Sequence, residues 1–148
     1  MGRQFTKLLY LSINGTLNPL SIPGAWAVYS IQVTNTGRGI ADAGTVAIGD
    51  MIDPNTSLFT GNFNGSGSPF VFIDGSGSNA SGLSLDFGSL GDGSDGVTFL
   101  ASGGGSMTPN GDFDPSVAGF SLQFDGAMNG ASGTANPTFT IQYRVQVE

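Results

Sequence analysis

The 148-residue chain contains no cysteine and no histidine. Without cysteine there are no disulfides and no thiolate metal ligands, and without histidine the Ser-His-Asp and Cys-His nucleophilic systems and the usual zinc sites are excluded. A carboxylate pair, as used in glycoside hydrolysis, remains chemically available because the chain has ten aspartates. Nothing in the sequence marks any of them for a raised pKa, so we expect that the protein is not an enzyme.

Charge is also scarce, since charged residues make up only 10% of the chain. An average soluble domain has about one quarter. The net charge is −7, and the four cations are scattered at Arg3, Lys7, Arg38 and Arg144. No basic stripe therefore exists to neutralise phosphates or anionic lipid headgroups, and no apolar run approaches the ~20 residues that span a bilayer. The sequence predicts neither a nucleic-acid partner nor membrane insertion.

Glycine and apolar residues are plentiful, with 25 Gly, 11 Phe and a hydrophobic content of 39%. This apolar content is enough to offset the entropy of ordering the chain, and the length suits one hydrophobic core. We therefore expect a single domain over residues 1–148. Its solubility must come from Ser, Thr, Asn and Gly, a composition that is common in surface-layer, pilus and adhesin domains and that favours an extracellular or cell-surface location.

Alternation of apolar and polar residues is the main pattern along the chain. It is clearest at 27–34 and 139–147, where one face is apolar and the other polar. The same alternation occurs at 45–48, 83–87 and 120–124, and shorter candidate strands are 70–73 and 97–100. Turn formers such as Pro-Gly, Asn-Gly and Asp-Gly separate these runs, and no long window has a helical period. The sequence predicts an all-β, immunoglobulin-like antiparallel β-sandwich of about seven to nine strands with Greek-key connections and at most a helical turn or two.

The N-terminal run 5–13 differs because both of its faces are apolar. Its apolar members are Phe5, Leu8, Leu9, Tyr10, Leu11 and Ile13. One interpretation is a first strand shared between the two sheets. The other is an exchangeable strand that completes the sheet of a neighbouring subunit by β-augmentation.

Acidic, glycine-rich loops are the candidate metal sites, since calcium binds carboxylate and backbone oxygens in such loops. The segments 74–79, 91–96 and 110–114 have this character, and the candidate ligands are Asp92, Asp95, Asp112 and Asp114. None of the segments matches the EF-hand loop. The alternative is that these aspartates favour turns by accepting bonds from nearby backbone amides. The aromatic residues that could stack on a sugar ring are Trp26, Phe63, Phe113 and Tyr29. For Trp26 the alternative is a core or interface position, which its large apolar area favours.

The stretch 14–37 reads NGTLNPLSIPGAWAVYSIQVTNTG and contains the spacing Tyr-x-Ile-x-Val-x-Asn-x-Gly at 29–37. It resembles the "conserved repeat" domain of bacterial and archaeal secreted surface proteins, a domain of unknown function. The resemblance covers about the first third of the chain, continues through 39–42 and 50–56, and returns in the last strand. At Asp53 the chain departs from the family, which often has an apolar or small residue before the proline.

The resemblance implies an immunoglobulin-like sandwich that serves as an extracellular building block, repeated in large proteins or assembled with copies of itself, with no assigned catalytic residues. From it and from the N-terminal run we expect a structural or adhesive module, either a filament or surface-layer subunit joined by strand complementation or one bead of a surface protein. The alternative is a carbohydrate- or calcium-binding module of a secreted protein. These functions differ in the partner that they require: identical subunits, glycans or Ca²⁺.

Overall fold

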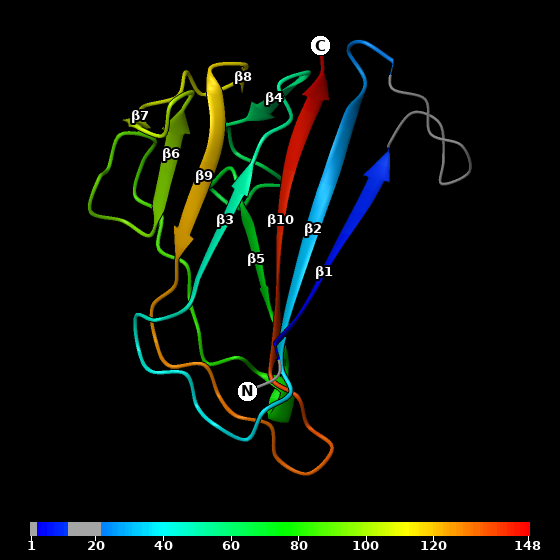
Figure 1. The fold of residues 1–148 in the computed structure, drawn as a ribbon, viewed down its shortest axis with the longest axis vertical. Helices are drawn as coiled ribbons and strands as arrows, with labels where there is room; N and C mark the ends of the chain where they lie inside the picture. Colours follow the sequence, from blue (N-terminus) through cyan, green and yellow to red (C-terminus); the bar gives the residue numbers. More distant parts are fainter. Residues whose placement is uncertain (1–2, 12–21) are drawn as a thin grey trace.

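The chain forms two antiparallel β-sheets (Figure 1), and buried side chains of both sheets belong to one hydrophobic core. The computed structural model describes residues 22–148 in full and residues 3–11 as a backbone strand. The six-stranded sheet contains β1 (Arg3–Leu11), β2 (Trp26–Asn35), β10 (Thr138–Val147), β4 (Thr56–Phe59) and β8 (Phe113–Asp114) in that order, with β5 (Val71–Asp74) paired to β10. The four-stranded sheet contains β3 (Ala47–Met51), β9 (Val117–Gln123), β6 (Val97–Ala101) and β7 (Ser106–Met107) in that order.

The predicted antiparallel β-sandwich is confirmed. The two runs with the clearest alternation form β2 and β10, and the single helical element of the described residues is one 3₁₀ turn, η1 (Gly77–Asn79). The strand predicted at 83–87 is wrong, because only one isolated bridge, between Ser84 and Asp125, forms there. Further along this segment, the Asp86 carbonyl accepts a bond from the amide of Gly96, whose own carbonyl bonds to Gln123. The side chains alternate, but the backbone bonds do not continue as a ladder.

Strand β10 is the central strand of the larger sheet. It pairs along its length with β2, while on its other side it pairs with β4 near its C-terminal end and with β5 near its N-terminal end. Its inner face consists of four buried side chains, Phe139, Ile141, Tyr143 and Val145. Its outer face carries Arg144, which is half-buried. Because β10 is bonded on both sides, residues far apart in the sequence meet around it.

The core between the sheets is largely aromatic. Phe120 of β9 lies 5.0 Å from Tyr143 and 4.7 Å from Phe70, measured between ring centroids. At the other end of the core, Phe124 and Phe139 lie 4.8 Å apart. Such edge-to-face and tilted contacts contribute to stability beyond the area they bury. The apolar faces of β9 and β10 therefore join the two sheets.

One polar contact crosses this core. The hydroxyl of Tyr143 on β10 donates to Oδ2 of Asp50 on β3 at 2.5 Å, and so links the two sheets. Burial raises the pKa of Tyr143 well above its usual range, and the hydrogen bond and negative charge of Asp50 raise it further. The folded protein therefore favours the neutral phenol.

A molecule with the Tyr143→Phe substitution tests this link. Because the folded-state pKa of Tyr143 is raised, its contribution is present below the unfolded pKa of about 10 and is lost as pH rises above it. We expect the substitution to cost about 1–3 kcal/mol in the free energy of unfolding at pH 7, measured by urea denaturation. Above pH ~10 we expect the wild-type protein to lose stability more steeply than the variant. Parallel pH dependences of the two proteins would contradict the assignment.

Candidate functional site

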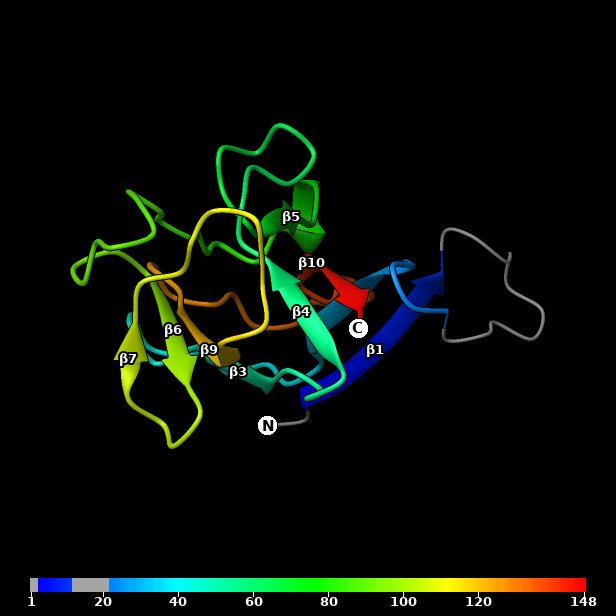
Figure 2. The same cartoon turned by 90° about the horizontal axis from the view of Figure 1, so that it is seen from above.

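Strand β1 lies at the edge of the six-stranded sheet (Figures 1 and 2). In both views it is on the opposite side of the molecule from β6 and β7. Its only backbone partner among the described strands is β2, along the register from Arg3 opposite Asn35 to Leu11 opposite Ala27. It therefore belongs to one sheet, and the interpretation that the first strand is shared between the two sheets is wrong.

The hydrogen-bond pattern shows which backbone groups of β1 face away from β2. The amide of Asn35 bonds to Pro137, so the odd-numbered residues of β2 direct their backbone groups to β10. Because backbone direction alternates along an antiparallel strand, the even-numbered residues of β2 face β1, and the odd-numbered residues of β1 face away from β2. The backbone groups of the predicted assembly residues Phe5, Leu9 and Leu11 thus face away from β2, while those of Leu8 and Tyr10 face β2. Ile13, also predicted, lies outside the described residues.

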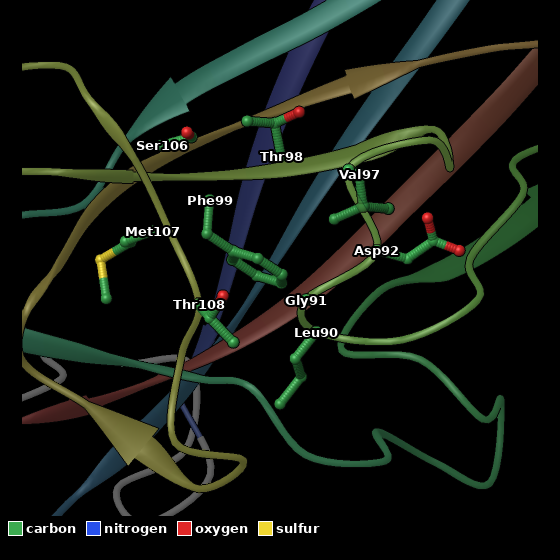
Figure 3. Close-up of a pocket in the computed structure, with 10 residues that line it drawn as sticks. Leu90, Gly91, Asp92, Val97, Thr98, Phe99, Ser106, Met107 and Thr108 are labelled. Atoms are coloured by element: carbon green, nitrogen blue, oxygen red, sulfur yellow. The ribbon is translucent and has the colours of Figure 1, made fainter.

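The acidic loop at 88–97 contains two of the predicted metal ligands. Asp92 accepts bonds from the Ser94 hydroxyl and amide at 2.6 and 2.9 Å, and these bonds hold the pKa of Asp92 below its ordinary value. Asp95 accepts bonds from the amides of Gly88 and Val97. Asp92 borders a cavity of about 150 Å³ between this loop and β6 and β7. Its carboxylate points away from Phe99 and Met107 in that cavity (Figure 3).

The other two predicted ligands flank β8. Asp114 is buried and accepts bonds from the Ser116 hydroxyl, the Ser116 amide and the Asn110 amide. Burial alone would raise the pKa of Asp114, but these donors outweigh it and lower the pKa. Asp112 is exposed and accepts the amide of Phe113. Within residues 22–148 no group of three acidic side chains is close enough to hold one ion. Calcium binding, and the alternative that these aspartates only favour turns, both remain predictions.

A cluster of aromatic rings surrounds Arg144 on the outer face of the six-stranded sheet. The guanidinium carbon lies 4.0 Å from the ring centroid of Phe59, 5.4 Å from Trp26 and Phe63, and 5.5 Å from Phe113. We call these five residues the arginine cluster. The guanidinium makes no hydrogen bond or ion pair with any described residue, and its buried Nε has no partner. Attraction between the cation and the ring faces is the contact that holds it.

The strand register explains how the cluster forms. Phe59 and Phe113 are opposite each other on β4 and β8, and their rings are 5.1 Å apart. Trp26 is on β2, two residue pairs along from Val28, which is the residue opposite Arg144. The loop after β4 brings in the buried Phe63, and a Cβ at Gly61 would lie 2.7 Å from the Phe59 ring, so no side chain fits there. Side chains that share a sheet face across neighbouring strands interact in this way.

The cluster unites three of the four aromatic residues proposed from the sequence. Tyr29 is elsewhere, stacked 5.2 Å from Tyr143 beside a cavity of about 390 Å³. Sequence reasoning missed Phe59 and Arg144. The available signal was Arg144 itself, the one cation in the alternating final strand, but nothing local to it indicates which rings lie across the sheet.

The geometry thus defines an antiparallel β-sandwich that has β1 at one sheet edge, with β2 as its one described partner, and an aromatic cluster around one cation. No family model matches the chain, and neither the curated proteins nor the solved structures contain a match. None of the helical segments in the described ranges is long and apolar enough to cross a membrane.

The variant Asp114→Asn tests whether this carboxylate has a structural role. Asparagine retains one acceptor oxygen for three donors, so we expect a loss of about 1–3 kcal/mol in unfolding free energy at pH 7. The lowered folded-state pKa means that this contribution is present above about pH 4 and disappears as pH falls. The difference between wild type and variant should therefore shrink below pH ~3. Asp86→Asn, at an exposed position, is the matched control; equal effects of the two substitutions would contradict the role.

Thermal unfolding with and without calcium tests the metal hypothesis. Extracellular calcium modules bind the ion at about 0.1–1 mM. Since Asp92, Asp95 and Asp114 already accept amide and hydroxyl donors, we expect the midpoint to stay unchanged at several times that concentration. A rise of many degrees, abolished in Asp92→Asn, would instead establish an ion site in the loop.

Proposed function

We propose that the protein is an extracellular structural subunit that assembles with copies of itself by exchange of β1. The observation that carries the proposal is the position of β1, a nine-residue strand at a sheet edge that has β2 as its one backbone partner among the described strands. In the assembly, β1 of one copy pairs with β2 of the next. The adhesive role of the assembled surface is part of the same proposal.

The free-energy difference between the monomer and the exchanged assembly is small, because β1 makes the same contacts with its own β2 as with the β2 of another copy. Residues 12–25 join β1 to β2, which is a longer connection than the two-residue turn of a tight hairpin. A connection of this length lets the strand reach a neighbouring copy, as in domain swapping. If each copy gives β1 to the next, the contact is head-to-tail and does not have to close, so the product is a filament.

The composition and the resemblance support an extracellular role. The chain relies on Ser, Thr, Asn and Gly for its polar surface and has few charges. Its motif at 29–37 resembles a repeat of secreted surface proteins. The structure also supplies a physical reason for that motif: Asn35 is buried, and its side-chain amide donates to the carbonyls of Gly39 and Asn129 while its oxygen accepts the Gly37 amide. The motif residues stabilise the end of β2.

A second candidate function is carbohydrate binding, and the arginine cluster is the observation that favours it. Half-buried Trp26 and Phe113 are at the margin of this cluster on the outer face of the sheet. Aromatic rings with partly exposed faces provide apolar surface for the C–H groups of sugars, and polar tips fix their orientation.

Engineered cysteines test the exchange of β1. Thr6 and Gln32 are opposite each other in the β1–β2 register, at a Cα separation of about 5.5 Å that suits a disulfide. The chain has no cysteine that could compete. In an oxidised mixture of the single variants Thr6→Cys and Gln32→Cys, we expect a disulfide between the two unlike chains. Thr6→Cys mixed with Thr98→Cys, which is exposed on the other sheet, is the control and should give none.

The double variant Thr6→Cys/Gln32→Cys gives the converse result. Oxidised as a monomer, it holds β1 on its own β2, so we expect it to stay at 15.0 kDa at all concentrations. After reduction it should assemble like the wild-type protein. Two results would overturn the proposal: a wild-type protein that stays monomeric at every concentration, or a locked variant that assembles as the wild type does.

A further inference from the structure

Arg144 is held by aromatic rings, although the chain has ten aspartates that could pair with it. Buried or half-buried arginines are usually paired with carboxylates, since desolvation of an unpaired charge is unfavourable. Arg144 has no such partner among the described residues, and its Nε is the one buried side-chain nitrogen or oxygen in that part of the chain without a hydrogen bond. The cluster therefore orients the guanidinium but provides neither an ion pair nor a hydrogen bond for it.

Contact with aromatic rings leaves the N–H donors of the Arg144 guanidinium available for a ligand. Rings contact a guanidinium through its flat faces, whereas its N–H bonds lie in its plane. Phe59, at 4.0 Å, is close enough to stack on one face. The two terminal nitrogens make no hydrogen bond with described residues and, unlike Nε, are not buried. They are donors with some exposure to solvent and with an orientation that the rings set.

A carboxylate is the group that fits these donors. The guanidinium fork matches a carboxylate with two parallel hydrogen bonds, and an apolar surround strengthens them. A phosphate or a polyanion fits less well, because no second cation of residues 22–148 belongs to the cluster and the net charge of the chain is −7. One carboxylate brings one negative charge to one positive charge.

The rings beside the guanidinium donors determine what the uncharged part of the ligand can be. Trp26 and Phe113 are half-buried and lie at similar distances from the guanidinium carbon, 5.4 and 5.5 Å. We propose that the arginine cluster binds a sugar acid, with its carboxylate on the terminal nitrogens of Arg144 and its ring against Trp26 or Phe113. This inference rests on the second candidate function, carbohydrate binding, and is independent of the exchange of β1.

Trp26 provides the readout, because it is the sole tryptophan of the chain. The experiment titrates the protein with sodium glucuronate and follows tryptophan fluorescence, with glucose and sodium acetate as matched ligands at equal ionic strength. We expect glucuronate to give a saturable change with a dissociation constant of about 1 mM, a usual strength for a single small ligand. Glucose should bind at least about tenfold more weakly than glucuronate because it lacks the charged group. Acetate should also bind at least about tenfold more weakly because it lacks the ring.

Two substitutions of the arginine distinguish charge from geometry. Arg144→Met should weaken glucuronate binding by about tenfold or more, and Arg144→Lys, which keeps the charge but not the fork, should give an intermediate affinity. Arg38→Met, at an exposed cation outside the cluster, should bind as the wild type does. Thermal unfolding of each variant verifies that it is folded, and the lysine variant provides the comparison if the methionine variant is not.

The outcomes distinguish sugar-acid binding from carbohydrate binding without the cation and from simple anion binding. No saturable change with glucuronate, or a change that folded Arg144 variants retain, overturns the proposal. Equal binding of glucose shows carbohydrate binding without a role for the cation, so the second candidate function stands and the sugar-acid assignment does not. Equal binding of acetate shows an anion site that does not recognise the sugar, and it likewise overturns the assignment.

Discussion

The contact between the inner faces of β9 and β10 is the interaction on which the rest of the structure depends. Phe120 and Leu122 of β9, together with Phe124 just after this strand, pack in one core with Phe139, Ile141 and Tyr143 of β10, and all six side chains are buried. Since the chain has no disulfide and few ion pairs are available to so few charges, hydrophobic burial must supply most of its stability. The remaining strands extend the two layers that this contact joins.

The sequence was informative where a strand is long and one of its faces is solvated. The alternation at 27–34 and 139–147 predicted β2 and β10, because a two-residue period is the direct consequence of a pleated strand with one buried face. The same reasoning failed at 83–87. There Leu83 is buried and Ser84 exposed, as the pattern requires, yet the backbone makes a single bridge. Periodicity reports which side chains are buried, and it does not report which backbone groups are bonded.

The candidate site was less predictable for a related reason. Arg144 and Phe59 become neighbours only because β4 pairs with β10, and Phe113 joins them only because β8 pairs with β4. Short strands such as β4 and β8 have too few residues to show a period, so their partners cannot be read from local sequence. The aspartates were easier to interpret: Asp92, Asp95 and Asp114 each accept donors from residues two to seven positions away, as turn-forming aspartates do.

Both proposals concern parts of the six-stranded sheet that lie outside the core between the two sheets. Strand β1 lies beyond β2 at the edge of the six-stranded sheet. The arginine cluster lies on the outer face of the same sheet. Backbone amide hydrogen exchange followed by NMR tests this division most directly. We expect the amides of Ile141 and Tyr143 to exchange only through global unfolding, whereas those of Leu8 and Tyr10 exchange faster through local release of β1. Equal protection of the two strands would contradict it, because β1 would then be as firmly held as the centre of the sheet.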